Sequence, residues 1–518
     1  MRRRLRPIPP AGHRATIPMP RPGRFPLPRL AVLAMAAALA ACAADDGGDA
    51  RPAGNDWGAL SFKPCALAGA ASRSGVEARC TTLEVPEDPA RPDGRKIALN
   101  IAWVPASNEA DATTDPVFFL AGGPGQSAAR TYPDLAAAFK EVRKTRHVIL
   151  VDQRGTGESN PLACPMGEGE DLLASDDMGA AALRCRDRLQ ERADLRFYTT
   201  GDAIRDLDSV RQALGVGKIN LMGVSYGTRV AQQYALQHPQ HTRTVLLDSV
   251  VPNTLPLGNL WARNLEDALA LQFGRCEQQA GCREKLGVPR EQLDQLLARL
   301  RSDPPLVRYR DASTNEQRET RLTPEMVAGL VRMFAYAPQA AALLPNLIHE
   351  ANQGRLDALT ALARMLLESM GDSMAMGMQF SVVCAEDADS MVAREEDRDT
   401  LLGNSITEGI AAACKVWPRG EMASNFRTPL GGDTPVLAIS GEFDPVTPPR
   451  YGDEAIAQLA NGRHLVLKGQ GHNVIAAGCM PKLFAQFVER ADAMGLDAAC
   501  LDNLSYTPPF TSFNGWEP

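Results

Sequence analysis

The fold is decided by the stretch K-I-N-L-M-G-V-S-Y-G-T-R-V-A, from Lys218 to Ala231. It begins as an apolar strand and continues with the spacing of a helix that ends before Pro239. G-V-S-Y-G between them matches G-x-S-x-G, a tight turn that presents a serine nucleophile between a strand and a helix. Gly223 and Gly227 are needed because side chains there would collide with the turn. We therefore predict that Ser225 is a nucleophile; an ordinary glycine turn is the alternative.

A serine hydroxyl is a weak nucleophile that needs a base, and the base needs a third group to orient it. In this strand–turn–helix context an acid and then a histidine follow the serine along the chain. Asp444 follows one apolar strand in a proline-rich loop, and His472 follows the next. His472 is the only histidine with both this order and a loop position, whereas His464 lies inside a strand. Glu442 and Asp433 are alternative acids.

Catalysis by a serine, a histidine and an acid also needs backbone N–H donors for the oxyanion that develops on the substrate. The residue after the nucleophile, Tyr226, supplies one donor. The sequence G-G-P-G follows another apolar strand, and its proline has no N–H. We therefore expect Gly123 to supply the second donor, with a plain turn as the alternative.

The order of strand-like and helix-like patterns predicts an α/β fold with an insertion. Strand patterns precede and include the G-x-S-x-G stretch, stop after about residue 251, and resume at 435–440 and 463–467. The intervening stretch is mostly helical in pattern. We predict a core of residues 61–251 and 431–518, with a helical cap, residues 252–430, inserted between two sheet strands.

The first 41 residues have the composition of an export signal, with several arginines before an apolar run too short to span a bilayer. The sequence L-A-A-C at 39–42 resembles a bacterial lipobox, which implies cleavage before Cys42 and its acylation. A plain signal peptide is the alternative, and Met19 is an alternative start. Residues 42–60, rich in Asp, Gly and Ala at their start, are expected to form a tether. The protein would then be exported and attached to a membrane through its lipid only.

Ten cysteines remain after Cys42, and an even number in an exported chain suggests disulfides. Connectivity does not follow from sequence alone, but the cysteines fall into neighbouring couples, so we expect sequential pairing: Cys65–Cys80, Cys164–Cys185, Cys276–Cys282, Cys384–Cys414 and Cys479–Cys500. No couple has the spacing of a zinc site, so we expect no metal. The net charge of −7, without a basic stripe, argues against a nucleic-acid partner.

The motifs together resemble one family. G-G-P-G, D-Q-R-G-T-G-E-S from Asp152 to Ser159, G-V-S-Y-G, G-E-F-D-P-V-T-P and G-H are similar to those of the α/β-hydrolase peptidases related to proline iminopeptidase, in the tripeptidyl aminopeptidase (TAP-like) branch. The resemblance extends from about Cys65 to Cys500. It implies a mostly parallel, doubly wound sheet. One departure is Ala121, where the iminopeptidase pattern has histidine.

The resemblance also implies an acidic clamp for the α-amine of a peptide substrate. Its candidates are Glu386 and Asp387, in S-V-V-C-A-E-D. Two solvated surface acids are the alternative. Asp152 and Arg154 are expected to form a buried ion pair beneath the oxyanion loop.

These features predict a serine exopeptidase that releases residues or short peptides from peptide N-termini through an acyl-enzyme, without a cofactor. A carboxylesterase acting on small esters is the main alternative, because the same groups cleave both bond types. A catalytically silent binding protein is more remote, since binding alone does not require all three groups. The sequence does not indicate the oligomeric state or the number of residues released.

Overall fold

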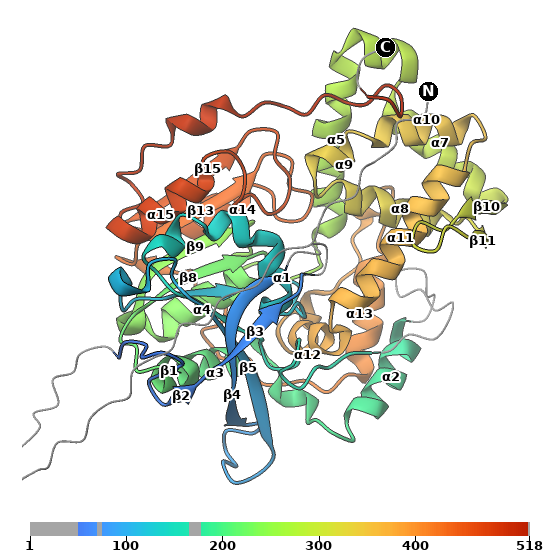
Figure 1. Cartoon of the computed structure of the whole chain (residues 1–518). Coiled ribbons are helices and arrows are strands. Elements are labelled where there is room, and N and C mark those ends of the chain that lie inside the picture. The colour runs from blue at the N-terminus through green and yellow to red at the C-terminus, as the bar shows by residue number, and fades with distance from the viewer. Residues whose placement is uncertain (1–49, 70–74, 165–177, 516–518) are drawn as a thin grey trace, which may run out of the picture. The chain divides into compact units, whose positions relative to one another are not determined.

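The computed structural model describes residues 50–69, 75–164 and 178–515. Their centre is a nine-stranded sheet of order β15-β13-β9-β8-β6-β7-β5-β4-β3. Strands β15 to β7 in this order run parallel, and β5, β4 and β3 complete one edge in antiparallel fashion (Figure 1). The bounds are β3 Lys63–Leu67, β4 Val76–Pro86, β5 Lys96–Val104, β6 Val117–Leu120, β7 Val148–Val151, β8 Ile219–Val224, β9 Thr242–Asp248, β13 Val436–Gly441 and β15 Gly462–Leu467.

The central strands are short apolar runs because both faces of the sheet are covered. Every residue of β6, β7, β8 and β13 is buried. One face packs on α1 (Ala128–Leu135) and α15 (Met480–Arg490), and the other on α3 (Thr200–Ala213), α4 (Tyr226–Gln237) and α14 (Arg450–Ile456). This arrangement confirms the predicted doubly wound, mostly parallel α/β fold.

The insertion lies between β9 and β13 and forms two parts. The first has its own apolar core, made by α5 (Trp261–Gln278), α7 (Pro289–Ser302), α8 (Pro324–Phe334), α10 (Leu344–Asn352) and α11 (Asp357–Ser373). The second comprises α12 (Met376–Glu386) and α13 (Ser405–Val416), whose apolar side chains join the main core together with α2 (Met178–Leu189). The insertion is therefore only partly a separate cap.

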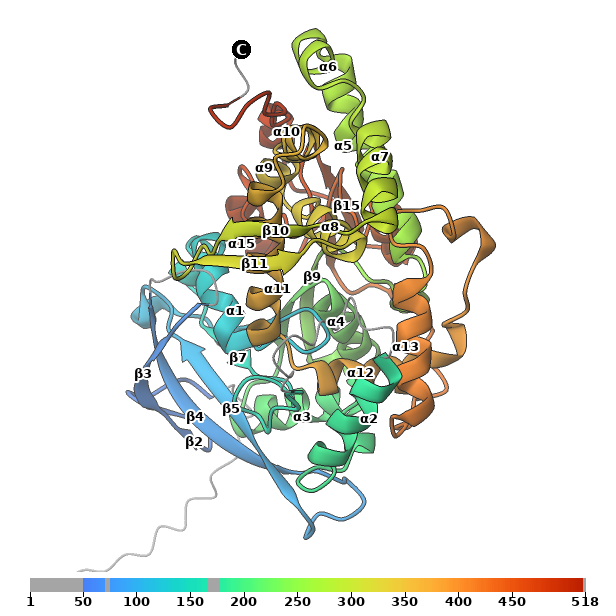
Figure 2. The same cartoon turned by 90° about the vertical axis from the view of Figure 1, so that its right-hand side faces the viewer.

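A hairpin within the insertion was not expected from its mostly helical pattern. Strands β10 (Leu306–Arg310) and β11 (Gln317–Arg321) pair antiparallel beside α8 and α11 (Figure 2). Only alternate residues of β10 are buried, and β11 buries none. Because these strands carry many charged residues, the apolar signal that marks a strand was weak.

The expected tether of residues 42–60 is wrong in its second half. Ala50 donates a backbone hydrogen bond to Gly215, and Trp57 is 1% exposed within the main core. The fold therefore includes the chain from residue 50 onward. The predicted signal peptide, lipobox and Cys42 lie outside the described residues. Among those that are described, no helix has the length and apolarity to cross a membrane.

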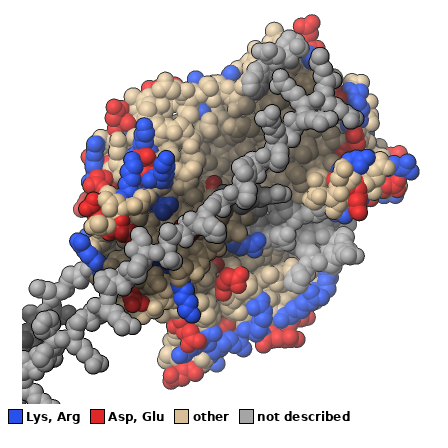
Figure 3. All heavy atoms as spheres, viewed as in Figure 1, with Lys and Arg blue, Asp and Glu red and all other residues tan. Residues whose placement is uncertain are grey.

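All five predicted disulfides are confirmed. Cys384–Cys414 joins α12 to α13 and so fixes the segment that carries Glu386. On the face shown in Figure 3, acidic and basic side chains are interspersed around a largely uncharged centre.

Candidate active site

Ser225 lies between β8 and α4 with φ 55° and ψ −123°, a backbone conformation that residues other than glycine rarely adopt. The turn is too tight for side chains at its flanking glycines. A Cβ at Gly223 would lie 2.3 Å from the carbonyl oxygen of Gly227, and one at Gly227 would lie 2.2 Å from that of Leu120. The strained turn therefore places a partly exposed serine at the end of a buried strand.

Asp444 and His472 are in direct contact, with Nδ1 of the imidazole 2.8 Å from Oδ2 of the carboxylate. Asp444 is 1% exposed and accepts further hydrogen bonds from the amides of Val446 and Thr447 and from the Thr447 hydroxyl. The alternative acid Glu442 instead accepts from the amide of Gly469. The described hydrogen bonds therefore join Asp444, and not Glu442, to the histidine.

The two groups shift each other's pKa values in the directions that favour an ion pair. Burial alone would raise the pKa of Asp444, but the charge of His472 and several hydrogen bonds outweigh it and lower that pKa. Burial alone would lower the pKa of His472, but Asp444 and, more weakly, Asp248 raise it above its ordinary value. A raised pKa suits an imidazole that must accept a proton.

The insertion contacts the loop that carries Asp444 and the loop that carries His472. The amide of His472 donates to the carbonyl of Tyr336, whose ring packs edge-on against the imidazole at 5.0 Å between centroids. Gln272 Nε2 bridges the carbonyls of Ala335 and Phe443, at 3.0 and 3.4 Å. The cap thus helps to position the loops that carry Asp444 and His472.

The two predicted oxyanion donors lie near Ser225. Tyr226 is the first residue of α4, where helix amides have no partner within the helix. The G-G-P-G loop reaches the serine at Gly122, where a Cβ would lie 3.1 Å from the Cβ of Ser225. Gly123, with φ 108°, is the next residue.

The predicted pair between Asp152 and Arg154 is wrong. Arg154 instead pairs with Asp206, at 2.6 Å. Asp152 accepts hydrogen bonds from the hydroxyl of Ser127 and the amide of Ala129, at the start of α1. Asp152 therefore supports the G-G-P-G loop through the helix that follows it.

The acids Glu386 and Asp387 are both buried, at 5% and 1% exposure, so they are not solvated surface acids. Asp387 pairs with Arg229, at 3.2 Å, and with Arg427. Glu386 accepts a hydrogen bond from the amide of Thr200 through Oε1, whereas its Oε2 has no hydrogen-bond partner among the described residues. Of the two predicted clamp residues, Asp387 is held by two arginines, whereas Glu386 keeps one carboxylate oxygen without a hydrogen bond among the described residues.

Glu386 is linked through Thr200 to Tyr226, the residue that follows Ser225. The hydroxyl of Thr200 lies 2.6 Å from the hydroxyl of Tyr226, and Gln153 donates to the same Tyr226 hydroxyl. Burial, opposed by Arg229, raises the pKa of Glu386 to about 7. A carboxylate with this pKa gains much from a nearby cation, because burial penalises its unpaired charge.

Comparisons with known proteins agree with the fold. The model of the alpha/beta hydrolase fold matches residues 115–283, and the model of TAP-like protein matches residues 399–500. The chain has the α/β hydrolase fold. The first matched region of this hydrolase contains Ser225, and the second contains Asp444 and His472.

The hydrolase has curated relatives among peptidases. It is 27% identical to serine protease Hip1 of Mycobacterium tuberculosis over 494 residues, 86% of this chain and 92% of that protein. It is 28% identical to a tripeptidyl aminopeptidase of Streptomyces lividans over 230 residues, 38% of this chain and 42% of that protein. A solved proline iminopeptidase of Mycobacterium smegmatis superposes with a TM-score of 0.40 at 16% identity, covering 79% of this chain and 98% of its own.

The hydrolase contains a second Ser–His–Asp set, which sequence reasoning missed. His464 Nε2 lies 3.0 Å from Ser440 Oγ, and its Nδ1 lies 2.8 Å from Asp453 Oδ1. Ser440 is 0% exposed, and a Cβ at Gly452 would lie 2.4 Å from His464 Nε2, so backbone covers the ring. No substrate carbonyl could reach this serine.

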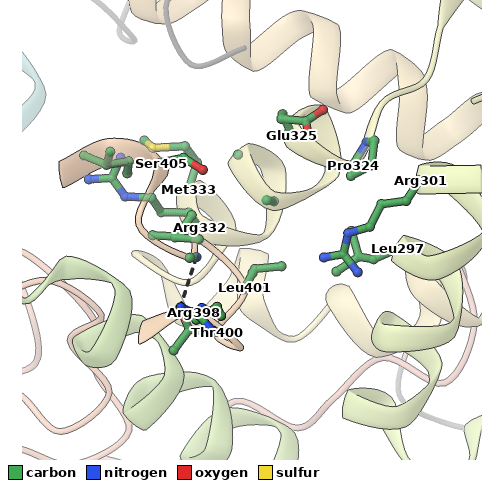
Figure 4. Close-up of a pocket in the computed structure, with 15 residues that line it drawn as sticks. Leu297, Arg301, Pro324, Glu325, Arg332, Met333, Arg398, Thr400, Leu401 and Ser405 are labelled. Carbon is green, nitrogen blue, oxygen red and sulfur yellow. Dashed lines mark hydrogen bonds between the residues drawn. The ribbon is translucent and has the colours of Figure 1, made fainter. Parts of the chain in front are cut away.

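A cavity of about 260 Å³ lies in the cap, between α7, α8 and the segment 398–406. Figure 4 shows Arg301 and Leu297 of α7 facing Met333 and Leu401 across it. None of the predicted catalytic, oxyanion or clamp residues lines this cavity.

Proposed function

We propose that the hydrolase is a serine aminopeptidase that cleaves short peptides from their N-terminal side. Peptidase relatives support the reaction class. The observation that carries the proposal is the buried Glu386, whose Oε2 has no hydrogen-bond partner among the described residues and which lies in the hydrogen-bonded network of Tyr226.

In the proposed mechanism, Ser225 attacks the scissile carbonyl while Nε2 of His472 takes its proton. Nδ1 of His472 faces Asp444, which orients the ring and stabilises the imidazolium. The amides of Tyr226 and Gly123 bind the oxyanion. His472 then protonates the leaving amine, and water hydrolyses the acyl-enzyme.

The ammonium group of a peptide substrate is a suitable partner for Glu386, because no arginine forms a hydrogen bond with its Oε2 among the described residues. Arg229 Nη1 is 3.9 Å from Glu386 Oε2, beyond hydrogen-bond distance, and Arg229 is already paired with Asp387. Glu386 therefore retains capacity for another cation. Arg229 and Arg427 neutralise Asp387, so that the clamp presents one available carboxylate.

The test compares short peptides that have a free N-terminus with the same peptides after N-acetylation. Wild type should cleave the free peptides far better, and Glu386→Gln should lose most of that preference, because the loss of one partner of a desolvated charge pair costs roughly 2 to 5 kcal/mol. Glu386→Gln should still hydrolyse an activated ester without an amine.

Asp389→Asn is the matched control, because it removes a carboxylate three residues along the chain that is 91% exposed. It should retain the preference of wild type. Equal cleavage of free and acetylated peptides by wild type would refute the clamp and favour the carboxylesterase.

The disulfides favour an oxidising compartment outside the cytoplasm. We further propose that the exported protein is anchored through an acylated Cys42. Mass spectrometry of the mature N-terminal peptide tests this, and an unmodified N-terminus at another residue would contradict it.

A further inference from the structure

The end of β9 contacts both the loop of the nucleophile and the loop of the base. The carbonyl of Asp248 accepts a hydrogen bond from the amide of Ser225, at 2.9 Å. The carboxylate of Asp248 accepts hydrogen bonds from the amides of Val474 and Ile475, each at 2.9 Å. One residue thus joins Ser225 to the segment that follows His472.

Ser249 extends this contact. Its hydroxyl accepts the amide of Asn473 at 2.8 Å, so the three amides after His472 are all bound by this dipeptide. Ser249 is itself anchored, because its amide donates to the carbonyl of Ile439 in β13. Its φ is 60°, a conformation that costs free energy in residues other than glycine.

Asp248 is a buried acid whose hydrogen-bond partners are two backbone amides and the hydroxyl of Ser249. It is 0% exposed, and no lysine or arginine of the described residues forms an ion pair with it. Burial raises its pKa to about 6, whereas the amides of Val474 and Ile475 and the charge of His472 lower it. The cation that acts on Asp248 is therefore the imidazolium of His472.

We propose that Asp248 and Ser249 are positioning residues that fix Ser225 and His472 relative to each other, and that the charge of Asp248 stabilises the imidazolium. This inference rests on the proposed roles of Ser225 and His472. Charged groups from three directions act on His472: Asp444 and Asp248 stabilise its protonated form, and Arg332 of the cap opposes it. The ring of Tyr336 covers a further side.

The first test is the pH profile of kcat/KM of Asp248→Asn on an activated ester without an amine. Removing the negative charge should lower the pKa of His472 and move the acid limb down by about half a pH unit or more. We also expect kcat to fall about tenfold, because the two loops lose part of their common anchor. A folded variant whose acid limb stays at the pH of wild type would overturn the electrostatic part.

The second test is Ser249→Gly. This variant should fold even if Asp248→Asn does not, because it keeps the carboxylate of Asp248 and glycine adopts a positive φ without strain. It should keep the acid limb of wild type but lose about threefold or more in kcat, with KM unchanged. An unchanged kcat would overturn the positioning role. Ser225→Ala, assayed alongside, separates the proposals: its inactivity upholds the assigned nucleophile, whereas activity would refute the proposed function itself.

Discussion

The two Ser–His–Asp sets of this hydrolase differ in an instructive way. In the set of Ser440, the described hydrogen bonds form a continuous chain from serine to histidine to aspartate. In the set of Ser225, the described hydrogen bonds join Asp444 to His472 but none joins Ser225 to His472. Such contacts often tighten only when substrate binds. A complete hydrogen-bond chain is therefore not what distinguishes a catalytic set.

Two physical differences do distinguish them, the environment of the serine and the burial of the acid. Ser225 is partly exposed on a strained turn at the start of a helix, whereas Ser440 is buried within a strand. Asp444 has a fully buried side chain, whereas that of Asp453 is 72% exposed, so water screens its charge. In the set of Ser225, the serine is therefore accessible and the charge of the acid acts strongly on the histidine. In the set of Ser440, the histidine only provides a hydrogen-bond partner for a buried hydroxyl.

The largest expected effect separates the two serines. Ser225→Ala should lose at least about a thousandfold in kcat/KM, because it removes the proposed nucleophile. Ser440→Ala should retain activity within about twofold but lose roughly 1 kcal/mol of unfolding free energy, since His464 loses a buried partner. Kinetics and thermal melting of both variants check this, and near-normal turnover by Ser225→Ala would refute the assignment.

The next effect separates the two acids. Asp444→Asn should lower kcat about a hundredfold or more, because the ring loses its orientation and its charge partner. The loss should be smaller than that for Ser225→Ala if Asp248 still stabilises the imidazolium. Asp453→Asn, the matched change at an exposed acid, should leave kcat unchanged. Equal losses in the two variants would contradict the distinction drawn from burial.

The sequence was informative where a few adjacent residues determine the geometry. The turn around Ser225 needs its two glycines locally, and Asp444 and His472 each follow a strand. Contacts between distant segments could not be predicted in this way. Arg154 binds Asp206 rather than its neighbour Asp152, because the folded chain and not the sequence spacing brings those side chains together.

The same limit explains the other surprises. Ser440 meets His464 because β13 pairs in parallel with β15, and sequence does not fix that register. Asp248 was recognisable only as the end of a strand, since its partners are backbone amides more than two hundred residues away. Likewise, the arginines that neutralise Asp387 lie outside its own helix, so sequence could not separate it from Glu386.

The smallest expected effect concerns stability and extends the comparison to Glu386, the acid of the proposed clamp. Because burial raises the pKa of Glu386 to about 7, the folded state binds a proton that the unfolded chain releases at lower pH. The stability that this proton contributes is fully present below about pH 4.5 and is lost as the pH rises through about 7. Glu386→Gln remains neutral throughout and keeps an acceptor for the amide of Thr200.

We therefore expect the melting temperature of Glu386→Gln to rise relative to wild type between pH 5 and pH 8, by the equivalent of at most roughly 3 kcal/mol. Asp248, whose pKa burial raises to about 6, is present in both proteins, so its contribution cancels in the difference. A peptide with a free N-terminus should reduce the difference at pH 8, because its ammonium pairs with the ionised carboxylate of wild type. An N-acetylated peptide should not reduce it. A difference that stays constant with pH would show that Glu386 is ionised throughout, and would remove the basis for treating it as a carboxylate that awaits a cation.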